Sequence, residues 1–532
     1  MYSHAEIERF ISRLEERVAP AERAAKEAWW RLATAATAEA QEELVRAGME
    51  YTRLFTDGGE FEKVERWYEE RDALENGLLR RQVEVLYRTF AGRQGDEALL
   101  ERVEELEARA NAVYGNHRGV VGGREAGENE IRDILRSSGD ETLRREAWEA
   151  SKTVGREVEE TVRELARLRN RLAREAGHTD HYHRSLDLQE IDAGDLGRTM
   201  AELEAATEAP FRGLKEDLDA RLESTFGVES VMPWHLYDPF FQEPPEDEGL
   251  DVDRYFRDRD LEALTLETYD SLGLDVRGVM AQSDLYSRAG KNQHAFCLSV
   301  GREYPYDVRV LANVRSDAYW MDTMLHEFGH AVYDRYINSR LPYFLRTIAH
   351  TCTTEAIALM MGSLSGDPGW LMTVAGVPEE ELRGDLEALA ARRRADRLVF
   401  TRWALVMFNF ERELYADPDR DDLNALWWDL VERLQMVKRP PGRDEPDWAA
   451  KIHVAVAPVY YHNYVLGNLI SAQLRNYLET HVTRGPFYEN EVAGRYLVES
   501  FFGPGARENW QDTVLRATGE PLSAGHFVRA LT

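Results

Sequence analysis

With 532 residues, the chain can form one very large hydrophobic core or several ordinary ones, because single cores stop growing at about 250 to 300 residues. Its 43% of hydrophobic and 31% of charged residues are typical of a globular protein and exclude a disordered tail. The formal net charge of −31 repels nucleic acids and anionic membrane surfaces, so we expect neither as a partner and interpret the excess acid as a solvated shell.

The N-terminus does not resemble a targeting signal. Met1 to Arg9 contain no basic segment followed by an apolar one, and no stretch of about 18 uncharged apolar residues occurs in the chain. The two cysteines, Cys297 and Cys352, are too few for a disulfide framework in a chain of this length. We therefore expect a cytoplasmic protein.

The first part of the chain has the pattern of long amphipathic helices. From Ala5 to about Asp192, apolar residues recur at three- and four-residue intervals among abundant Glu, Arg and Ala. A short β element is predicted between His294 and Val314, where HAFCLSV and VRVLANV alternate apolar and β-branched residues. Pro, Gly and acidic residues cluster in short segments, which we interpret as loops: 92–96, 243–249, 363–369 and 439–447.

The strongest chemical signal is the H-E-x-x-H motif at His326–His330. It lies in a segment with helical apolar spacing, Met321 to Tyr333. Residues four apart share one face of a helix, so His326 and His330 can bind one Zn²⁺ through their ring nitrogens. Glu327, next to them, can take a proton from a metal-activated water and pass it to the leaving amine.

A zinc site of this type needs a third protein ligand, often a glutamate on a following helix. Glu355 has this place, because it opens an apolar run that extends to Met361 and reads as a buried helix. The alternative is a first-turn glutamate that only stabilises the helix dipole. With three protein ligands, one position stays open for water, which is typical of a hydrolytic site.

Hydrolysis also needs a donor for the oxyanion that forms on the attacked carbonyl. The segment from Lys451 to Tyr464 concentrates hydroxyl and imidazole donors behind one lysine. Each tyrosine in it could equally be an aromatic core residue.

These blocks, taken in order, resemble the angiotensin-converting-enzyme family of peptidyl-dipeptidases and, more distantly, the thimet oligopeptidase and oligoendopeptidase group. The resemblance covers roughly the C-terminal 40% of the chain. It is made by HEFGH at His326, TEAI at Thr354, LWWDL at Leu426, DWAAKIH ending at His453, and the tyrosine pair Tyr461 and Tyr464.

The resemblance implies a role for each matching residue. His326, His330 and Glu355 would bind one zinc ion, and Glu327 would be the general base and acid. Tyr464 would stabilise the oxyanion and His453 would hold the substrate backbone. Lys451 and Tyr461 would grip the C-terminal carboxylate of a peptide, with Gln242 as a weaker candidate. A strand near 311–314, including Ala312 and Asn313, would pair with the substrate.

The chain departs from the family pattern at several positions. One extra residue lies between His453 and Tyr461, so Tyr460 could exchange roles with Tyr461. Asn463 and Val431 stand where the animal enzymes have the arginines of their chloride sites, so we do not expect chloride activation. Leu359 replaces an acidic residue that would support the zinc ligands, so that support must come from elsewhere.

We therefore predict a mainly α-helical, two-lobed metallopeptidase with a deep central cleft and a small β element near the zinc site. It would be a single catalytic domain over residues 1–532, with interwoven lobes of about 1–240 and about 250–532. The predicted reaction is release of dipeptides from the C-termini of short peptides. The alternatives are an oligoendopeptidase or a carboxypeptidase with the same zinc site, and a non-catalytic helical protein that keeps zinc for structure.

Overall fold

A computed structural model of the chain describes residues 4–245 and 249–531, so part of the predicted loop at 243–249 lies outside the described residues. Helices make up most of this part of the chain, and its strands form two small two-stranded sheets. The prediction of a mainly α-helical fold is confirmed. In the described residues, no helix is long and apolar enough to cross a lipid bilayer.

The chain divides into two units, and each is assembled from three separate stretches. Unit 1 consists of Met1–Gln94, Asp251–Leu389 and Leu466–His526, and unit 2 of Gly95–Leu250, Ala390–Val465 and Phe527–Thr532. The sequence placed a lobe boundary near residues 240–250, and one crossing does lie at Leu250. Other crossings fall inside the regular helices α16 (Leu386–Ala416), α19 (His462–Tyr477) and α22 (Ala524–Arg529), where no Gly or Pro cluster marks them.

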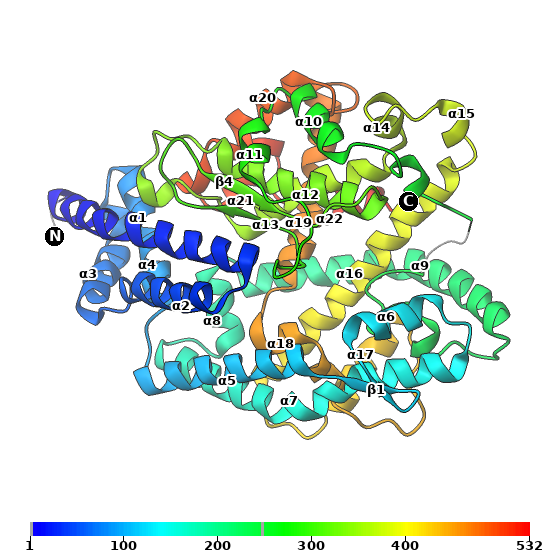
Figure 1. Cartoon of the computed structure of the whole chain (residues 1–532). Coiled ribbons are helices and arrows are strands. Elements are labelled where there is room, and N and C mark those ends of the chain that lie inside the picture. Colours follow the sequence, from blue (N-terminus) through cyan, green and yellow to red (C-terminus); the bar gives the residue numbers. More distant parts are fainter. Residues whose placement is uncertain (1–3, 246–248, 532) are drawn as a thin grey trace. The chain divides into compact units, whose positions relative to one another are not determined.

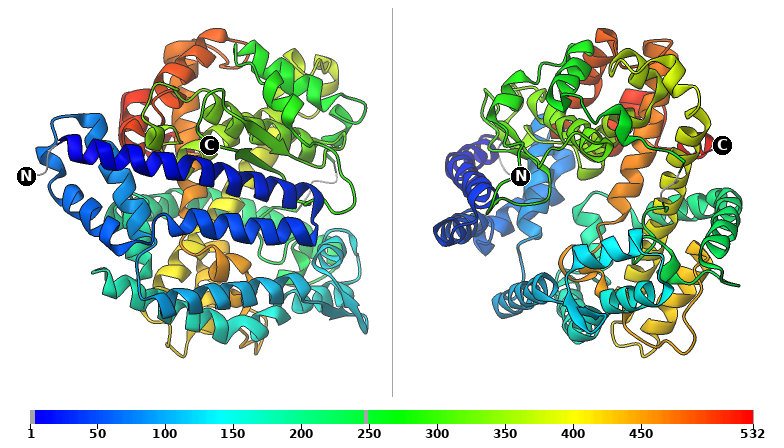
Figure 2. Two further views of the ribbon diagram at one scale, coloured as in Figure 1. Left: turned by 60° about the vertical axis from the view of Figure 1, so that its left-hand side comes forward. Right: turned by 45° about the vertical axis from the view of Figure 1, so that its right-hand side comes forward.

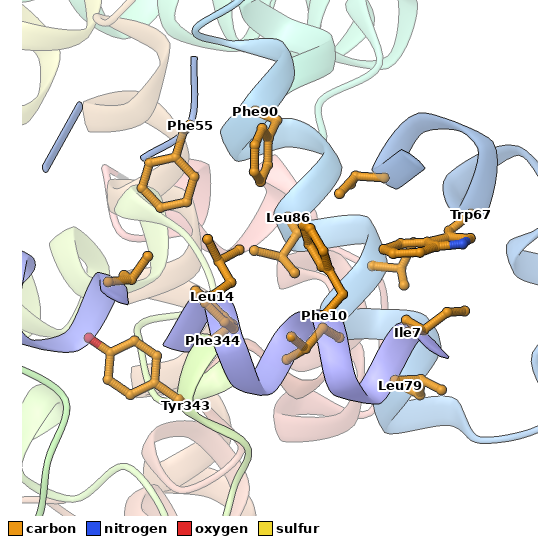
Figure 3. Packing of buried hydrophobic residues seen from close by; sticks show 14 of the residues in the cluster. Ile7, Phe10, Leu14, Phe55, Trp67, Leu79, Leu86, Phe90, Tyr343 and Phe344 are labelled. Atoms are coloured by element: carbon orange, nitrogen blue, oxygen red, sulfur yellow. The ribbon is translucent and has the colours of Figure 1, made fainter. Parts of the chain in front are cut away.

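Unit 1 begins with four helices. The first two, α1 (His4–Ala35) and α2 (Ala38–Arg53), lie side by side as a hairpin (Figure 2). Phe10, Trp67 and Phe90 belong to a buried hydrophobic cluster that also includes Tyr343 and Phe344 (Figure 3). The other regular helices of this unit are α3 (Gly58–Glu69), α4 (Gly77–Ala91), α10 (Leu261–Ser271), α11 (Arg277–Gln282), α12 (Ala318–Arg335), α13 (Thr351–Gly362), α14 (Pro368–Thr373), α15 (Glu379–Leu382), α20 (Glu491–Leu497) and α21 (Trp510–Thr518).

The β element predicted between His294 and Val314 is present in unit 1. Strands β3 (Phe296–Ser299) and β4 (Val308–Leu311) pair antiparallel, with Phe296 opposite Leu311 and Ser299 opposite Val308. On its other side, β4 forms a parallel bridge from Leu311 to Asp284. Both edges of β4 are therefore paired at this end, whereas in the described residues β3 pairs with β4 alone.

Unit 2 contains the longest helices, and its regular elements are α5 (Glu97–Asn116), β1 (Gly119–Val121), β2 (Arg124–Ala126), α6 (Glu128–Ser137), α7 (Glu141–Glu175), α8 (His181–Leu188), α9 (Ala193–Phe226), α17 (Leu423–Gln435) and α18 (Ile452–Val456). The β1–β2 hairpin interrupts a region for which only helices were predicted. Gly122 and Gly123, both with positive φ, form its turn, because glycine adopts this backbone conformation without steric cost.

Candidate metal centre

Helix α12 presents the two histidines of the H-E-x-x-H motif on one face. The Asp317 side chain accepts the Trp320 N–H and caps the helix two turns before the motif. The rings of His326 and His330 lie 4.9 Å apart between centroids, as expected for residues one turn apart. The helix therefore brings two imidazoles to one place.

Helix α13 supplies the third predicted ligand. Its first turn is fixed by a reciprocal cap, in which the His350 ring accepts the Cys352 N–H and the Thr353 hydroxyl accepts the His350 N–H. Glu355 follows in the next turn of this helix. The third ligand thus lies on a helix whose start is locked by its own side chains.

Two glycines let the backbone approach the site closely. A Cβ atom on Gly329 would lie 2.8 Å from the Cα of Ala358, so α12 and α13, which pack side by side (Figure 1), can touch only because this residue has no side chain. A Cβ on Gly467, in the part of α19 that belongs to unit 1, would lie 3.0 Å from Glu355 Cβ. Close backbone packing therefore sets the distance from Glu355 to the histidines.

These three residues form a donor set that fits a metal ion. One ligand atom each from His326, His330 and Glu355 lies within 4.8 Å of the others, and His326 Nε2 is 3.9 Å from Glu355 Oε2. Two imidazole nitrogens and one carboxylate oxygen are the ligands of hydrolytic zinc sites. In the described residues, no other group of three His, Cys, Asp or Glu side chains lies this close together.

Burial of the site disfavours every charge in it. It lowers the pKa of His326 to about 4, and together with the neighbouring His326 it lowers the pKa of His330. Burial also raises the pKa of Glu355 to about 7. The histidines are thus held in the neutral form that ligates metals, and a divalent cation would favour the carboxylate form of Glu355.

Glu327 lies next to the ligands and is almost completely buried. Burial, reinforced by the charge of Glu355, raises the pKa of Glu327 to about 8, while a hydrogen bond from the Cys297 backbone N–H opposes the shift. A carboxyl group whose pKa lies near neutrality can both accept and return a proton, which is what a general base and acid must do. The same hydrogen bond ties Glu327 to strand β3.

In the predicted substrate strand at 311–314, Ala312 and Asn313 are already hydrogen-bonded within the protein. The Ala312 N–H donates to Asp284 O at 2.9 Å, the Ala312 carbonyl accepts a hydrogen bond from Lys291, and the Asn313 amide donates to the carbonyls of Asn292 and Gln293. Ala312 therefore has no open edge for a peptide. In the described residues β3 pairs with β4 alone, and the Cys297 N–H is hydrogen-bonded to Glu327. The sequence pattern predicted both strands but could not show which of them is the edge strand of the sheet.

Unit 2 gathers the other predicted residues. Lys451 Nζ donates to Gln242 Oε1 at 2.6 Å and lies 6.0 Å from the centre of the Tyr461 ring. Tyr461 is buried, and its ring lies 5.1 Å from that of His453 and 5.6 Å from that of Tyr464. We refer to Gln242, Lys451, His453, Tyr461 and Tyr464 as the lysine cluster. Tyr460 is more exposed and contacts Tyr464, so Tyr461 is the tyrosine beside Lys451.

The lysine cluster contains a buried positive charge whose hydrogen-bond partner is neutral, while the charge of nearby Asp238 opposes the effect of burial on it. Gln242 is the hydrogen-bond partner of Lys451 Nζ, and among the described residues no carboxylate forms an ion pair with it. Burial lowers the pKa of Lys451 to about 8, and burial together with Lys451 lowers that of His453 to about 4. His453 Nδ1 is buried and has no hydrogen-bond partner in the described part of the chain. Such groups suit an anionic, hydrogen-bonding ligand.

Some residues around both sites had no signal in the sequence. Asp238 accepts the side-chain amide of Gln242 and so leaves its oxygen for Lys451. Thr354 lies at hydrogen-bond distance from the ring of His330 and so gives a polar contact that the apolar Leu359 cannot give. The side-chain amide of Asn463 donates to Gln189. The contacts of Lys451, His330 and Asn463 join residues far apart in sequence, so spacing could not predict them.

A helical fold with two histidines on one helix, a glutamate from the next and a buried glutamate between the histidines defines a metallopeptidase. The family model described as angiotensin-converting enzyme matches residues 1–215 and 293–528, and the chain belongs to this family. The match includes the three candidate ligands, Glu327 and the lysine cluster apart from Gln242. A comparison with curated proteins gave no match.

Proposed function

We propose that the protein is a zinc peptidase that releases dipeptides from the C-terminal end of short peptides. Family membership and the His326, His330 and Glu355 cluster support metal-dependent peptide hydrolysis. The observation that carries the proposal of C-terminal release is Lys451, a buried ammonium group whose hydrogen-bond partner is the neutral Gln242. Such a group would bind a free carboxylate strongly.

The residues of the metal centre would share the chemical work as follows. A zinc ion held by the three ligands supplies Lewis-acid polarisation of the scissile carbonyl and lowers the pKa of a water molecule. Glu327 accepts a proton from the attacking water at its carboxylate and later donates it to the leaving nitrogen. A bound metal ion would favour the carboxylate form of Glu327 that accepts the proton, while burial favours the protonated form that returns it.

Two residues of the lysine cluster would act on the reacting peptide group. We propose that the Tyr464 hydroxyl donates a hydrogen bond to the oxyanion and that His453 holds the peptide backbone. Donors aimed at developing charge commonly contribute about 10²- to 10³-fold to the rate. The unpartnered Nδ1 of His453 supports a role in which a ligand completes its hydrogen bonds.

Lys451 and Tyr461 would fix the cleavage position by holding the C-terminal carboxylate. Asp238 supports this role indirectly, because it orients Gln242 so that the Gln242 oxygen faces Lys451. The aromatic rings around Lys451 exclude water and so strengthen its attraction to a carboxylate. We also propose that activity does not depend on chloride, since Asn463 and Val431 carry no positive charge.

The test is mass spectrometry of the products formed from an unblocked decapeptide by the zinc-loaded enzyme. We expect successive loss of C-terminal dipeptides, no cleavage after chelation, and no cleavage by Glu327→Gln, which keeps the size of the side chain but cannot accept the proton. The same decapeptide with a C-terminal amide is the matched substrate control and should be cleaved far more slowly.

Other product patterns would identify the alternatives. Internal cuts that persist on the amidated peptide would indicate an oligoendopeptidase, and loss of single residues would indicate a carboxypeptidase. Tight zinc binding without cleavage of any peptide in a mixed library would indicate the non-catalytic binding protein.

A further inference from the structure

His330 has a specific partner on its second ring nitrogen. Its Nδ1 lies 2.7 Å from the Thr354 hydroxyl oxygen, a normal hydrogen-bond distance. Thr354 is nearly buried, so this bond is shielded from competing water. The contact leaves Nε2 of His330 as the nitrogen that can face the shared site with His326 and Glu355.

We propose that Thr354 is a positioning residue for metal binding, in that its hydroxyl fixes the ring of His330 with Nε2 toward the metal. This inference rests on the proposed function only for the identity of the metal. A ligating imidazole must keep its lone pair on the metal-facing nitrogen, so its proton lies on Nδ1 and is donated to an acceptor. The Thr354 oxygen is that acceptor.

Thr354 directly precedes Glu355 in the chain. Two adjacent residues of α13 therefore supply a candidate ligand and the support for another candidate ligand. The reciprocal cap of His350 and Thr353 holds this turn in place. Gly329 of α12 packs on Ala358 of α13 and so keeps the two helices at the separation that the hydrogen bond between His330 and Thr354 requires. The orientation of His330 thus depends on α13 as a whole.

The experiment measures zinc affinity by competition with a chromophoric chelator, on the full chain. Thr354→Val keeps the shape and removes the hydroxyl, and should weaken zinc binding about 10- to 100-fold. Thr354→Ser restores a hydroxyl and should bind zinc within about threefold of the unmodified protein. Thr354→Ala serves as a second hydroxyl deletion if the valine variant folds poorly.

Thr265→Val is the matched control. Thr265 is fully buried in helix α10, and its hydroxyl donates to Leu261 O of the same helix rather than to a residue of the metal centre. It should lower the melting temperature and leave zinc affinity unchanged. A purely structural role of Thr354 would make both valine variants behave alike.

Two outcomes would overturn the proposal: zinc affinity of Thr354→Val equal to that of the unmodified protein, or failure of Thr354→Ser to restore it. Because zinc affinity is measured without any peptide, the result is separate from the proposed peptidase activity. A protein that binds zinc with this dependence on residue 354 but cleaves no peptide would refute the proposed function and support the role of Thr354.

Discussion

Burial acts on charges of opposite sign in the metal centre and in the lysine cluster. In the metal centre it raises the pKa of Glu327 and Glu355, so the site gains stability from a cation. In the lysine cluster it lowers the pKa of Lys451, so that site gains stability from an anion. The first arrangement suits a metal ion and the second a peptide carboxylate. The chain therefore surrounds the candidate metal ligands and the candidate carboxylate-binding lysine with environments that favour ligands of opposite charge.

Glu355→Gln is the strongest test of whether the metal centre binds a cation. The substitution removes the one negative ligand and should weaken zinc binding by about 3 to 5 kcal/mol, or roughly 10²- to 10⁴-fold, as loss of one member of a buried charge pair does. Chelator competition measures the effect. Glu479→Gln, a partly buried glutamate away from the metal centre, is the control. Unchanged zinc affinity in Glu355→Gln would mean that Glu355 is not a ligand.

Tyr464→Phe tests whether a hydroxyl of the lysine cluster takes part in the reaction itself. We expect kcat to fall about 10²- to 10³-fold with little change in zinc affinity, because only the oxyanion donor is lost. Steady-state kinetics on one peptide measures this. Tyr460→Phe is the matched control and should be nearly silent. The reverse result would exchange the roles of the two tyrosines.

Lys451→Met tests whether the lysine cluster binds the C-terminal carboxylate of a peptide. The side chain keeps its length and loses its charge, so kcat/KM for peptides with a free C-terminus should fall about 10- to 100-fold, the value of a hydrogen-bonded charge. Amidated peptides should be cleaved equally by both proteins. If the variant lost activity on both substrates to the same degree, Lys451 would not act through the carboxylate.

Gly329→Ala tests whether backbone packing sets the metal centre. The added methyl group would meet the Cα of Ala358 at 2.8 Å, so we expect a loss of about 1 to 3 kcal/mol in the free energy of unfolding, together with weaker zinc binding. Denaturant titration measures the stability. Gly213→Ala, in helix α9 with open space around it, should be neutral or stabilising.

The smallest expected effect is a pH dependence. Lys451 is charged below its pKa of about 8 and neutral above it, so kcat/KM for free-carboxylate peptides should fall as pH rises through this value. The decrease should approach tenfold per pH unit at most. It should be absent in Lys451→Met and with amidated peptides. If kcat/KM of Lys451→Met still fell as pH rose through this range, the titration of another group would be the cause.

Local patterns in the sequence were sufficient for the mainly helical fold, for one β hairpin and for the grouping of the candidate metal ligands. His326, His330 and Glu355 lie in one short stretch, where helical periodicity and the H-E-x-x-H spacing determine which side chains share a face. The second β hairpin was missed, although the paired glycines Gly122 and Gly123 were a usable turn signal.

Long-range contacts were beyond this kind of inference. Gln242 and Lys451 are 209 positions apart, and no periodicity links them. The resemblance placed the substrate strand at Ala312 and Asn313, whereas the hydrogen bond from Ala312 to Asp284, 28 positions earlier, could not be predicted from the strand pattern. Support for His330 comes from Thr354, a residue whose sequence context suggested only the start of a helix.

The division of each unit into separate stretches has a consequence for biosynthesis. The ribosome completes His326, His330 and Glu355 well before the stretch Leu466–His526 that finishes unit 1. Gly467 follows Glu355 by 112 positions, so at about 5 to 20 residues per second the nascent chain must wait roughly 6 to 22 seconds before Gly467 can pack against Glu355. During this interval, apolar surface of unit 1 stays uncovered, and we expect the emerging protein to engage chaperones before it can acquire its metal.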